Sequence, residues 1–332
     1  MFRAPPHGAS ASWEVGDIQA MSVSTHVTTT GVPVGVWLQT SRVKSLLIST
    51  ISVATGAAVA AWERHTSAAL VLAWMAAVAA QAGTNLINVS FNYKAGDLLA
   101  PGALADPLGS SAPVRSGLLT PQQVRRGALL CFAASVACGA ALAWLVDPRL
   151  LWLGIPGLLA GYYYAAPPVR LAYLGLGVIT VFVFMGPVMV AGSYSVASAR
   201  VSSGAWAAAI AVGLTAAAVM HVNDLRDYAG DVAHGKQTLS TILGRSGASW
   251  LMAAMLGGAY AAIAAAVALR MLPLASLVVL LSAPMAARMT RLVFVERDPV
   301  RLNEAWFLGV KLHTAFGVLL VGALLLTTLI GR

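Results

Sequence analysis

A short acidic stretch, NDLRDYAGD (residues 223–231), carries three oxygen-bearing side chains at intervals of four residues. On an α-helix, Asn223, Asp227 and Asp231 fall within an arc of about 80°. Carboxylates gathered this closely repel one another unless a cation lies between them. Mg²⁺ favours a few oxygen ligands supplemented by water and substrate phosphates. The stretch therefore predicts a site for Mg²⁺ and a diphosphate, with these three residues as metal ligands.

A second stretch, NLINVSFNYKAGD (residues 85–97), repeats this geometry with carboxamides. Asn85, Asn88 and Asn92 fall within an arc of about 60° on a helix, and Asp97 follows. A carboxamide oxygen can bind a metal, although it carries no charge. We predict Asn88, Asn92 and Asp97 as further metal ligands and Asn85 as a substrate contact. The alternative is that these asparagines hold helices together by interhelical hydrogen bonds.

The elements that must position these stretches are membrane helices. Of the 332 residues, 58% are hydrophobic and 10% are charged, whereas soluble domains carry about 25% charged residues. An apolar run of about 20 residues is long enough to cross a bilayer. The sequence predicts an all-α integral membrane bundle of about nine transmembrane helices. The apolar runs lie at 45–62, 67–91, 126–146, 150–168, 173–196, 204–222, 248–269, 272–290 and 307–330.

Two kinds of segment lie outside the predicted helices. Residues 1–40 lack the pattern of a signal peptide and are rich in Ser, Thr, Gly and Pro, which predicts a disordered tail. The remaining residues, 41–332, are predicted to form one transmembrane domain. Its two longest polar connections, at about 92–125 and 223–247, adjoin the two motif stretches. We expect these connections to cap the site.

The positions of the basic residues predict the orientation. The net charge is +9, but no basic cluster is interleaved with aromatic residues, so we expect no nucleic acid partner. Over nine helices, fifteen Lys and Arg residues fall on the side of the N-terminus and five on the opposite side. Cytoplasmic loops carry the excess of basic residues. We expect a multi-pass protein of the bacterial cell membrane, with its N-terminus and active site cytoplasmic and its C-terminus outside.

Four stretches are similar to one family. SRVKSLLIS and RSGLLTPQQVRRGALL resemble its entry to the first helix and its connection into the third. LAYLGLGVITVFVFMGPVMVAGSY resembles the fifth helix of its menaquinone-biosynthesis branch, and NDLRDYAGDVAHGKQTLSTILGR resembles that branch's second aspartate motif. With motifs of the form N-x3-D-x3-D on helices two and six, the chain resembles the UbiA superfamily of intramembrane prenyltransferases from about residue 40 onwards. The resemblance implies a helical fold with a cytoplasm-facing central cavity, in which Mg²⁺ holds an isoprenoid diphosphate.

Several positions depart from the family pattern. The position of Asn92 is normally aspartate, that of Val89 is often aspartate, and the final aspartate usually lies one residue beyond Asp97. The first motif has lost negative charge and should hold Mg²⁺ more weakly. On the fifth helix, menaquinone-type enzymes carry an acidic residue on the acceptor side where this chain has Val178. An aromatic acceptor that must be oriented or deprotonated would lose its acid or base there.

Cationic residues are expected to assist loss of the diphosphate. Its departure builds negative charge on oxygen, which Mg²⁺ together with Arg and Lys stabilises. Exposed cations of membrane proteins more commonly only set the topology. The candidates for the catalytic role, at cytoplasmic helix ends or in cap loops, are Arg42, Lys94, Arg115, Arg226 and Lys236.

Aromatic residues crowd the fourth and fifth predicted helices. A carbocation needs an apolar wall with electron-rich rings that do not trap it. We therefore predict Tyr164, Tyr173, Phe184 and Tyr194 as substrate contacts. On membrane helices, such rings more commonly serve packing alone.

Three functions remain open at this point. Val178 and the depleted first motif favour a Mg²⁺-dependent terpene cyclase of the UbiA type, which ionises an isoprenoid diphosphate and closes the cation on its own chain. The alternative is a prenyltransferase that moves the chain onto a small aromatic acceptor, as the overall likeness to the menaquinone branch suggests. A transporter or non-catalytic scaffold would explain the first motif but not the intact second one. Besides the lipid bilayer, the expected partners are an isoprenoid diphosphate and, for a transferase, the acceptor.

Overall fold

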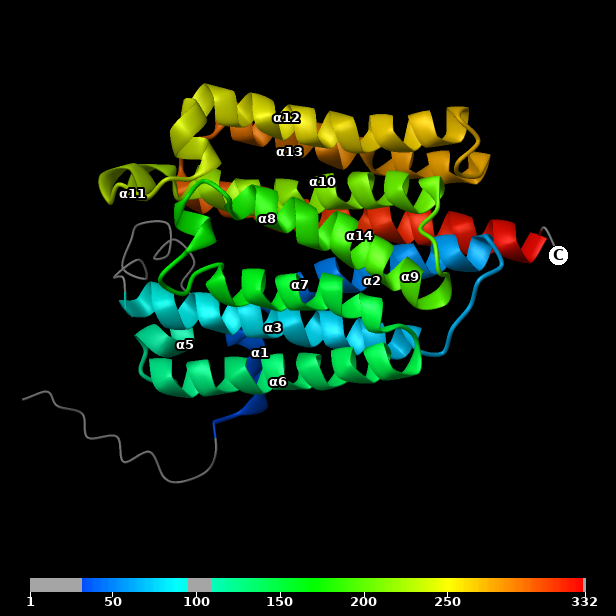
Figure 1. Ribbon diagram of the computed structural model, residues 1–332. Coiled ribbons are helices and arrows are strands. Elements are labelled where there is room, and N and C mark those ends of the chain that lie inside the picture. The colour runs from blue at the N-terminus through cyan, green and yellow to red at the C-terminus, as the bar shows by residue number, and fades with distance from the viewer. Residues whose placement is uncertain (1–31, 95–108, 331–332) are drawn as a thin grey trace, which may run out of the picture.

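The computed structural model describes residues 32–94 and 109–330. This part of the chain is a bundle of long helices that lie alongside one another (Figure 1). Eight of its helical segments are long and apolar enough to cross a membrane. The fourth predicted span is α7 (Leu151–Tyr163), which has 13 residues, contains Pro156 and is shorter than an ordinary spanning helix. The predicted all-α membrane fold is confirmed.

The helices follow the predicted apolar runs. In chain order the α-helices are α1 (Val34–Thr40), α2 (Leu46–Trp62), α3 (Leu70–Lys94), α5 (Ala112–Arg115), α6 (Pro121–Leu145), α7 (Leu151–Tyr163), α8 (Gly177–Val183), α9 (Met189–Ala197), α10 (Ser203–Arg226), α11 (Tyr228–Ala233), α12 (Leu239–Ala268), α13 (Ala283–Val295) and α14 (Pro299–Ile330). The fifth span consists of α8, a π-helical turn (Phe184–Val188) and α9, and the eighth consists of a 3-10 helix (Leu274–Ser282) and α13.

The segments predicted as tail and cap loops contain short helices. Within the stretch expected to be a disordered tail, Val34–Thr40 form α1, and Thr40 is fully buried. The first cap connection contains α5, and the second contains α11. Residues 1–31, the rest of the predicted tail, lie outside the described part of the chain.

Local sequence signals fix where the helices after the cap segments begin. At α6, Thr120 and Gln123 form a capping box in which each side chain accepts from the other residue's backbone N–H, and Pro121 occupies the first helical turn. At α12, Thr238 and Thr241 form the same arrangement. Such boxes satisfy two of the backbone N–H groups that a helix start leaves without partners. They end the cap segments at defined residues.

The fifth span packs closely on α10 at its π-helical turn. Gly186 lies in this turn, and a Cβ atom on Gly186 would lie 2.4 Å from the carbonyl oxygen of Ala209 and 2.7 Å from Cα of Gly213. Only residues without a side chain allow two backbones to approach so closely. The contact fixes the fifth span against the helix that carries the second motif.

The sequence predicts one continuous helix for the second motif, but the structure shows a break within it. α10 ends at Arg226, Asp227 has a non-helical ψ of 0°, and α11 starts at Tyr228. Backbone hydrogen bonds from Asp227 N to Asn223 O and from Asp231 N to Asp227 O are both 2.9 Å long. The four-residue spacing therefore survives the break, because these bonds keep a helix-like rise through it.

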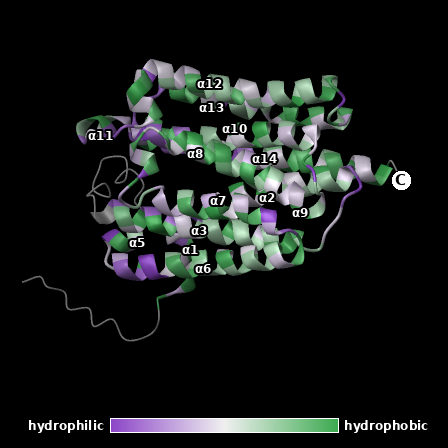
Figure 2. Cartoon of the chain, in the orientation of Figure 1, coloured by the Kyte–Doolittle hydropathy of each residue, from purple (hydrophilic) through white to green (hydrophobic). Residues whose placement is uncertain are grey.

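One end of the bundle gathers hydrophilic residues. Figure 2 shows them near α5, α11 and the start of α6, whereas the long middles of the helices are mostly apolar. This end also carries the end of α10. The second motif thus lies at the polar end of the bundle.

Candidate active site

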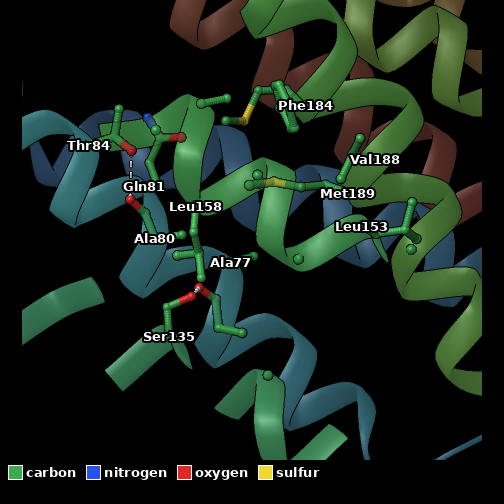
Figure 3. A pocket seen from close by; sticks show the side chains of 18 of the residues that line it. Ala77, Ala80, Gln81, Thr84, Ser135, Leu153, Leu158, Phe184, Val188 and Met189 are labelled. Atoms are coloured by element: carbon green, nitrogen blue, oxygen red, sulfur yellow. Dashed lines mark hydrogen bonds between the residues drawn. The ribbon is translucent and has the colours of Figure 1, made fainter. Parts of the chain in front are cut away.

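A cavity of about 460 Å³ opens between α3, α6, α7 and the fifth span. Most of its wall is apolar, with Leu158, Val188 and Met189 among the residues that Figure 3 labels. Its polar lining includes Arg42 and Asn88. Such a shape suits a ligand with a long apolar chain and a polar head.

The asparagines of the first motif lie on one helix, α3, as predicted. Asn92 Nδ2 donates to Asn88 Oδ1 at 2.6 Å. Asn85 faces the segment between α1 and α2 instead: its Nδ2 donates to Ser41 O at 2.8 Å and to Ser45 Oγ at 3.0 Å. Asn85 and Asn88 both line the cavity. Asn85 thus also ties α3 to the connection before α2, as a structural asparagine would, while Asn88 and Asn92 form a pair.

The two predicted acidic ligands of the second motif, Asp227 and Asp231, are each paired with one of the predicted cations. Arg226 binds Asp227 through two hydrogen bonds, Nε to Oδ1 and Nη2 to Oδ2, both 2.8 Å long. Lys236 Nζ lies 3.0 Å from Asp231 Oδ1. Asp231 is only 7% exposed, so its pair with Lys236 is largely removed from water. Two of the predicted metal ligands, Asp227 and Asp231, therefore lie together in one cluster with two of the predicted diphosphate contacts, Arg226 and Lys236.

Lys236 is charged despite its burial. Burial opposes the ammonium form, but Asp231, Asp224 and Asp227 outweigh it and raise the pKa of Lys236 above its ordinary value. A lysine with a raised pKa carries a full positive charge at neutral pH. Lys236 can therefore offer a charge-assisted hydrogen bond to an anion at this end of the bundle.

Tyr173 joins the two motifs. Its hydroxyl donates to Asn92 Oδ1 at 3.0 Å, and Lys236 Nζ lies 5.2 Å from the centre of its ring. The chain beside it is held to the loop after α11, since Gly175 N donates to Gln237 O at 2.9 Å. Tyr173 thus brings the carboxamides of α3 and the charged cluster after α10 into contact.

Two further predicted cations lie near the first cap segment. Arg42, in the left-handed conformation with φ 55°, donates from Nε to Ser110 Oγ at 2.8 Å and lines the cavity. Arg115, at the end of α5, donates from Nη1 to Ser111 Oγ at 2.5 Å. The Arg42 guanidinium therefore binds the first cap segment, and that of Arg115 makes a bond within this segment.

The remaining predicted site residues fall in different places. Tyr164 and Phe184 line the cavity, as Figure 3 shows for Phe184. Tyr194 does not: it is 1% exposed, and its hydroxyl donates to Glu63 Oε2 beyond the end of α2. The register of α9 turns this ring into the core, so Tyr194 is corrected to a packing residue. The side chain of Lys94, and Asp97, lie outside the described residues.

Two residues of the cluster were not among the predicted site residues. Asn303 of α14 accepts a 2.9 Å hydrogen bond from Arg226 Nη1, so the last helix also holds the site. Asp224 of α10 is 5% exposed and interacts electrostatically with Lys236. Asn303 could not be predicted from the sequence, because the motif on α10 does not reveal which other helix packs against that motif. Asp224 is one of only twelve acidic residues in the chain and could have been chosen for that reason.

The donor set fits a hard divalent cation. Asp227 and Asp231 offer carboxylate oxygens, and Asn88, Asn92 and Asn223 offer carboxamide oxygens, which are ligands that Mg²⁺ accepts. Within residues 32–94 and 109–330, no group of three or more His, Cys, Asp or Glu side chains is arranged to hold an ion by itself. A metal at this site would therefore also need carboxamide, water or diphosphate oxygens.

Comparison with known sequences points to one family. The profile of the UbiA prenyltransferase family matches residues 48–327. The 1,4-dihydroxy-2-naphthoate octaprenyltransferase of Escherichia coli (strain K12) is 29% identical over 273 residues, which cover 80% of this chain and 87% of that protein. The protein of the same name from Mycobacterium tuberculosis is 30% identical over 295 residues, which cover 85% of this chain and 98% of that protein.

Solved structures share the fold. A UbiA homologue from Aeropyrum pernix K1 in its apo form has a TM-score of 0.64 and 22% identity, covering 84% of this chain and 96% of that one. A UbiA homologue from Archaeoglobus fulgidus bound to GPP and Mg²⁺ has a TM-score of 0.58 and 17% identity, covering 86% and 99%. At these identities, the likeness establishes the helical architecture.

Proposed function

The chain belongs to the UbiA prenyltransferase family, and from this premise we propose that it transfers an isoprenoid chain from its diphosphate to a small hydroxylated aromatic acceptor. It is a membrane enzyme that processes isoprenoid diphosphates. The relatives described above are 1,4-dihydroxy-2-naphthoate octaprenyltransferases. They favour the transfer alternative over the cyclisation that the depleted first motif and Val178 had suggested.

The observation that carries this proposal is the continuity between the apolar cavity and the charged cluster. Asn88 lines the cavity and is hydrogen-bonded to Asn92. Asn92 accepts from Tyr173, whose ring lies against Lys236. An isoprenoid diphosphate has the same two parts, an apolar chain and an anionic head. The chain fits the apolar wall, and the head fits the cluster at its polar end.

The residues of the cluster would act on the diphosphate. Arg226 and Lys236 can donate hydrogen bonds to its oxygens and stabilise the charge that grows there as the carbon–oxygen bond breaks. In the structure both cations are bound to Asp227 and Asp231. If the two acids bind a divalent cation instead, Arg226 and Lys236 become available to the diphosphate.

We propose Mg²⁺ as that cation. The residues that would hold it are Asp227 and Asp231, with the carboxamides of Asn88, Asn92 and Asn223 completing the set. When bound, Mg²⁺ would stabilise negative charge on the leaving diphosphate. The binding of GPP and Mg²⁺ by the homologue from Archaeoglobus fulgidus supports this assignment.

The acceptor decides between transfer and cyclisation. Membranes that contain the protein are incubated with Mg²⁺ and isoprenoid diphosphates of several lengths, with and without 1,4-dihydroxy-2-naphthoate, and the products are identified by mass spectrometry. We expect a prenylated aromatic product that requires the acceptor. A terpene hydrocarbon or alcohol formed equally without the acceptor would establish the cyclase instead.

Asn92 tests whether the first motif binds the metal. In Asn92→Asp, a carboxylate replaces the amide that donates to Asn88, so the pair should gain attraction for a cation, while the Asn88 amide can donate to the new carboxylate. We expect half-maximal activity at a lower Mg²⁺ concentration than in the wild type, and Asn92→Leu should require more Mg²⁺ or stop ionisation. If these asparagines only join helices, the Mg²⁺ titrations of all three proteins will coincide. Asn92→Leu will then mainly lower the melting temperature, because it removes a hydrogen bond that contributes about 1 kcal/mol to stability.

The orientation in the membrane is also a proposal. We propose from the excess of basic residues on one side that the cap segments, the site and the N-terminus are cytoplasmic and that the C-terminus lies outside. The division into a tail (residues 1–40) and a single transmembrane domain (residues 41–332) also stays a proposal, in which α1 is an ordered part of the tail. A reporter inserted near Gly109 should read as cytoplasmic and one fused after Arg332 as outside, and a cytoplasmic C-terminus would contradict the nine-span topology.

A further inference from the structure

The polar end of the cavity contains a buried hydroxyl group without a partner. Tyr164, directly after α7, lines the cavity and is 6% exposed. Within the described part of the chain, its hydroxyl makes no hydrogen bond. A buried polar group without a partner is costly, and native structures rarely keep one without a reason. The position therefore points to a ligand that completes the hydrogen bonding of Tyr164.

The charged neighbours of this hydroxyl come from two other parts of the bundle. Asp224 of α10 and Arg42, before α2, both interact with it electrostatically. A tyrosine hydroxyl is protonated at neutral pH, so it can both donate and accept a hydrogen bond. No hydrogen bond joins Asp224 to another of the described residues, so its carboxylate can accept one from a ligand.

Val178, the position at which the family resemblance leads one to expect an acid, lies near the start of α8 and close to these residues. Val178 is 4% exposed and belongs to a buried cluster with Val222 and Leu225, which lie on either side of Asp224 along α10. Gly177, the residue before Val178, lies so near Tyr164 that a Cβ atom on it would be 3.1 Å from the tyrosine hydroxyl. An acid on α10 and the hydroxyl after α7 thus both lie near the start of α8.

We propose that Tyr164 and Asp224 form the acceptor subsite, in which they hydrogen-bond the hydroxyl groups of a hydroxylated aromatic acceptor. In this arrangement, Asp224 on α10 supplies the carboxylate that α8 lacks at Val178. The cavity wall would hold the aromatic rings against the isoprenoid chain. This subsite rests on the proposed function, because it needs an enzyme with a second, aromatic substrate.

The test measures the two substrates separately. Tyr164→Phe and Asp224→Asn are compared with the wild type in three quantities: the acceptor KM, with 1,4-dihydroxy-2-naphthoate as the acceptor, the diphosphate KM and the Mg²⁺ requirement. We expect each variant to raise the acceptor KM about tenfold, as for loss of one hydrogen bond to a buried partner. In Tyr164→Phe, the diphosphate KM and the Mg²⁺ requirement should stay at wild-type values. Asp224→Asn also removes a charge that acts on Lys236, so its acceptor KM should rise by more than its diphosphate KM. Tyr163→Phe is the matched control, since Tyr163 is the adjacent tyrosine and does not line the cavity.

A binding readout makes the result independent of turnover. Addition of 1,4-dihydroxy-2-naphthoate alone should raise the melting temperature of the detergent-solubilised wild type and of Tyr163→Phe, and it should raise that of Tyr164→Phe and Asp224→Asn much less. If the wild type transfers prenyl groups but both variants keep its acceptor KM, or change the diphosphate KM instead, the subsite is refuted while the proposed function stands. If the acceptor neither stabilises the wild type nor receives a prenyl group, both are refuted.

Discussion

Asp227→Asn and Asp231→Asn are each expected to lower turnover by about 1000-fold, which corresponds to roughly 4 kcal/mol of lost charge stabilisation. Each substitution keeps the size of the side chain but removes the charge that would hold a cation next to the diphosphate. It also leaves Arg226 or Lys236 beside a neutral oxygen. The measurement is prenyl transfer at saturating Mg²⁺ and substrates, together with the melting temperature of each purified variant.

The melting temperatures of the variants show whether turnover is lost because a metal ligand is missing or because the protein unfolds. Asp231 is buried and its partner Lys236 is 21% exposed. Removing one partner of a buried ion pair can cost about 3–5 kcal/mol, so Asp231→Asn alone would be ambiguous. The Asp227 side chain is 29% exposed, so Asp227→Asn should keep the wild-type melting temperature. Asp147→Ala is the control, because Asp147 also pairs with a neighbouring arginine, Arg149, but outside the site. A folded Asp227→Asn variant with normal turnover would remove this acid from the mechanism.

Ala77→Phe should shorten the isoprenoid chain that the enzyme accepts. Ala77 of α3 and Leu158 of α7 both line the cavity (Figure 3). A phenyl ring at position 77 would take up apolar space needed by the far end of a long chain. An isoprene unit has five carbons, each worth about 0.8 kcal/mol when buried. Excluding one unit should therefore cost about 4 kcal/mol and lower kcat/KM roughly a thousandfold for chains that reach Ala77. Turnover of isoprenoid diphosphates of increasing length gives the measurement.

Short substrates provide the internal check on Ala77→Phe. A chain too short to reach Ala77 should be transferred at the wild-type rate, which shows that the site itself is intact. Val71→Phe adds the same ring to the same helix at a side chain that is 60% exposed, and it should change neither rate. Equal losses for short and long chains would place the isoprenoid chain outside this cavity.

The number and type of elements could be read from the sequence because they depend on local properties. Runs of about 20 apolar residues must satisfy their backbone groups internally in a bilayer, and a helix does this without any partner. The four-residue spacing of Asn223, Asp227 and Asp231 likewise depends on the local backbone and not on which helices surround them. Even the break at Asp227 left this spacing in place, since the backbone bonds across it have the helical reach.

The contacts between helices required the tertiary structure. Helical periodicity states which residues share a face, but not which helix that face meets. The sequence grouped Tyr164, Tyr173 and Tyr194 as one aromatic set, whereas packing placed Tyr164 on the cavity, Tyr173 between the two motifs and Tyr194 against Glu63.

The rotation and depth of each helix are set by close approaches of the kind that Gly186 makes with α10. Such approaches depend on the shapes of both surfaces at once, so no single stretch of sequence contains them. For the same reason, the bond from Arg226 to Asn303 and the shared corner of Tyr164 and Asp224 became visible only in the folded chain. The sequence by itself determined which side chains could bind a metal and a diphosphate, and the packing of the helices decided which of them meet.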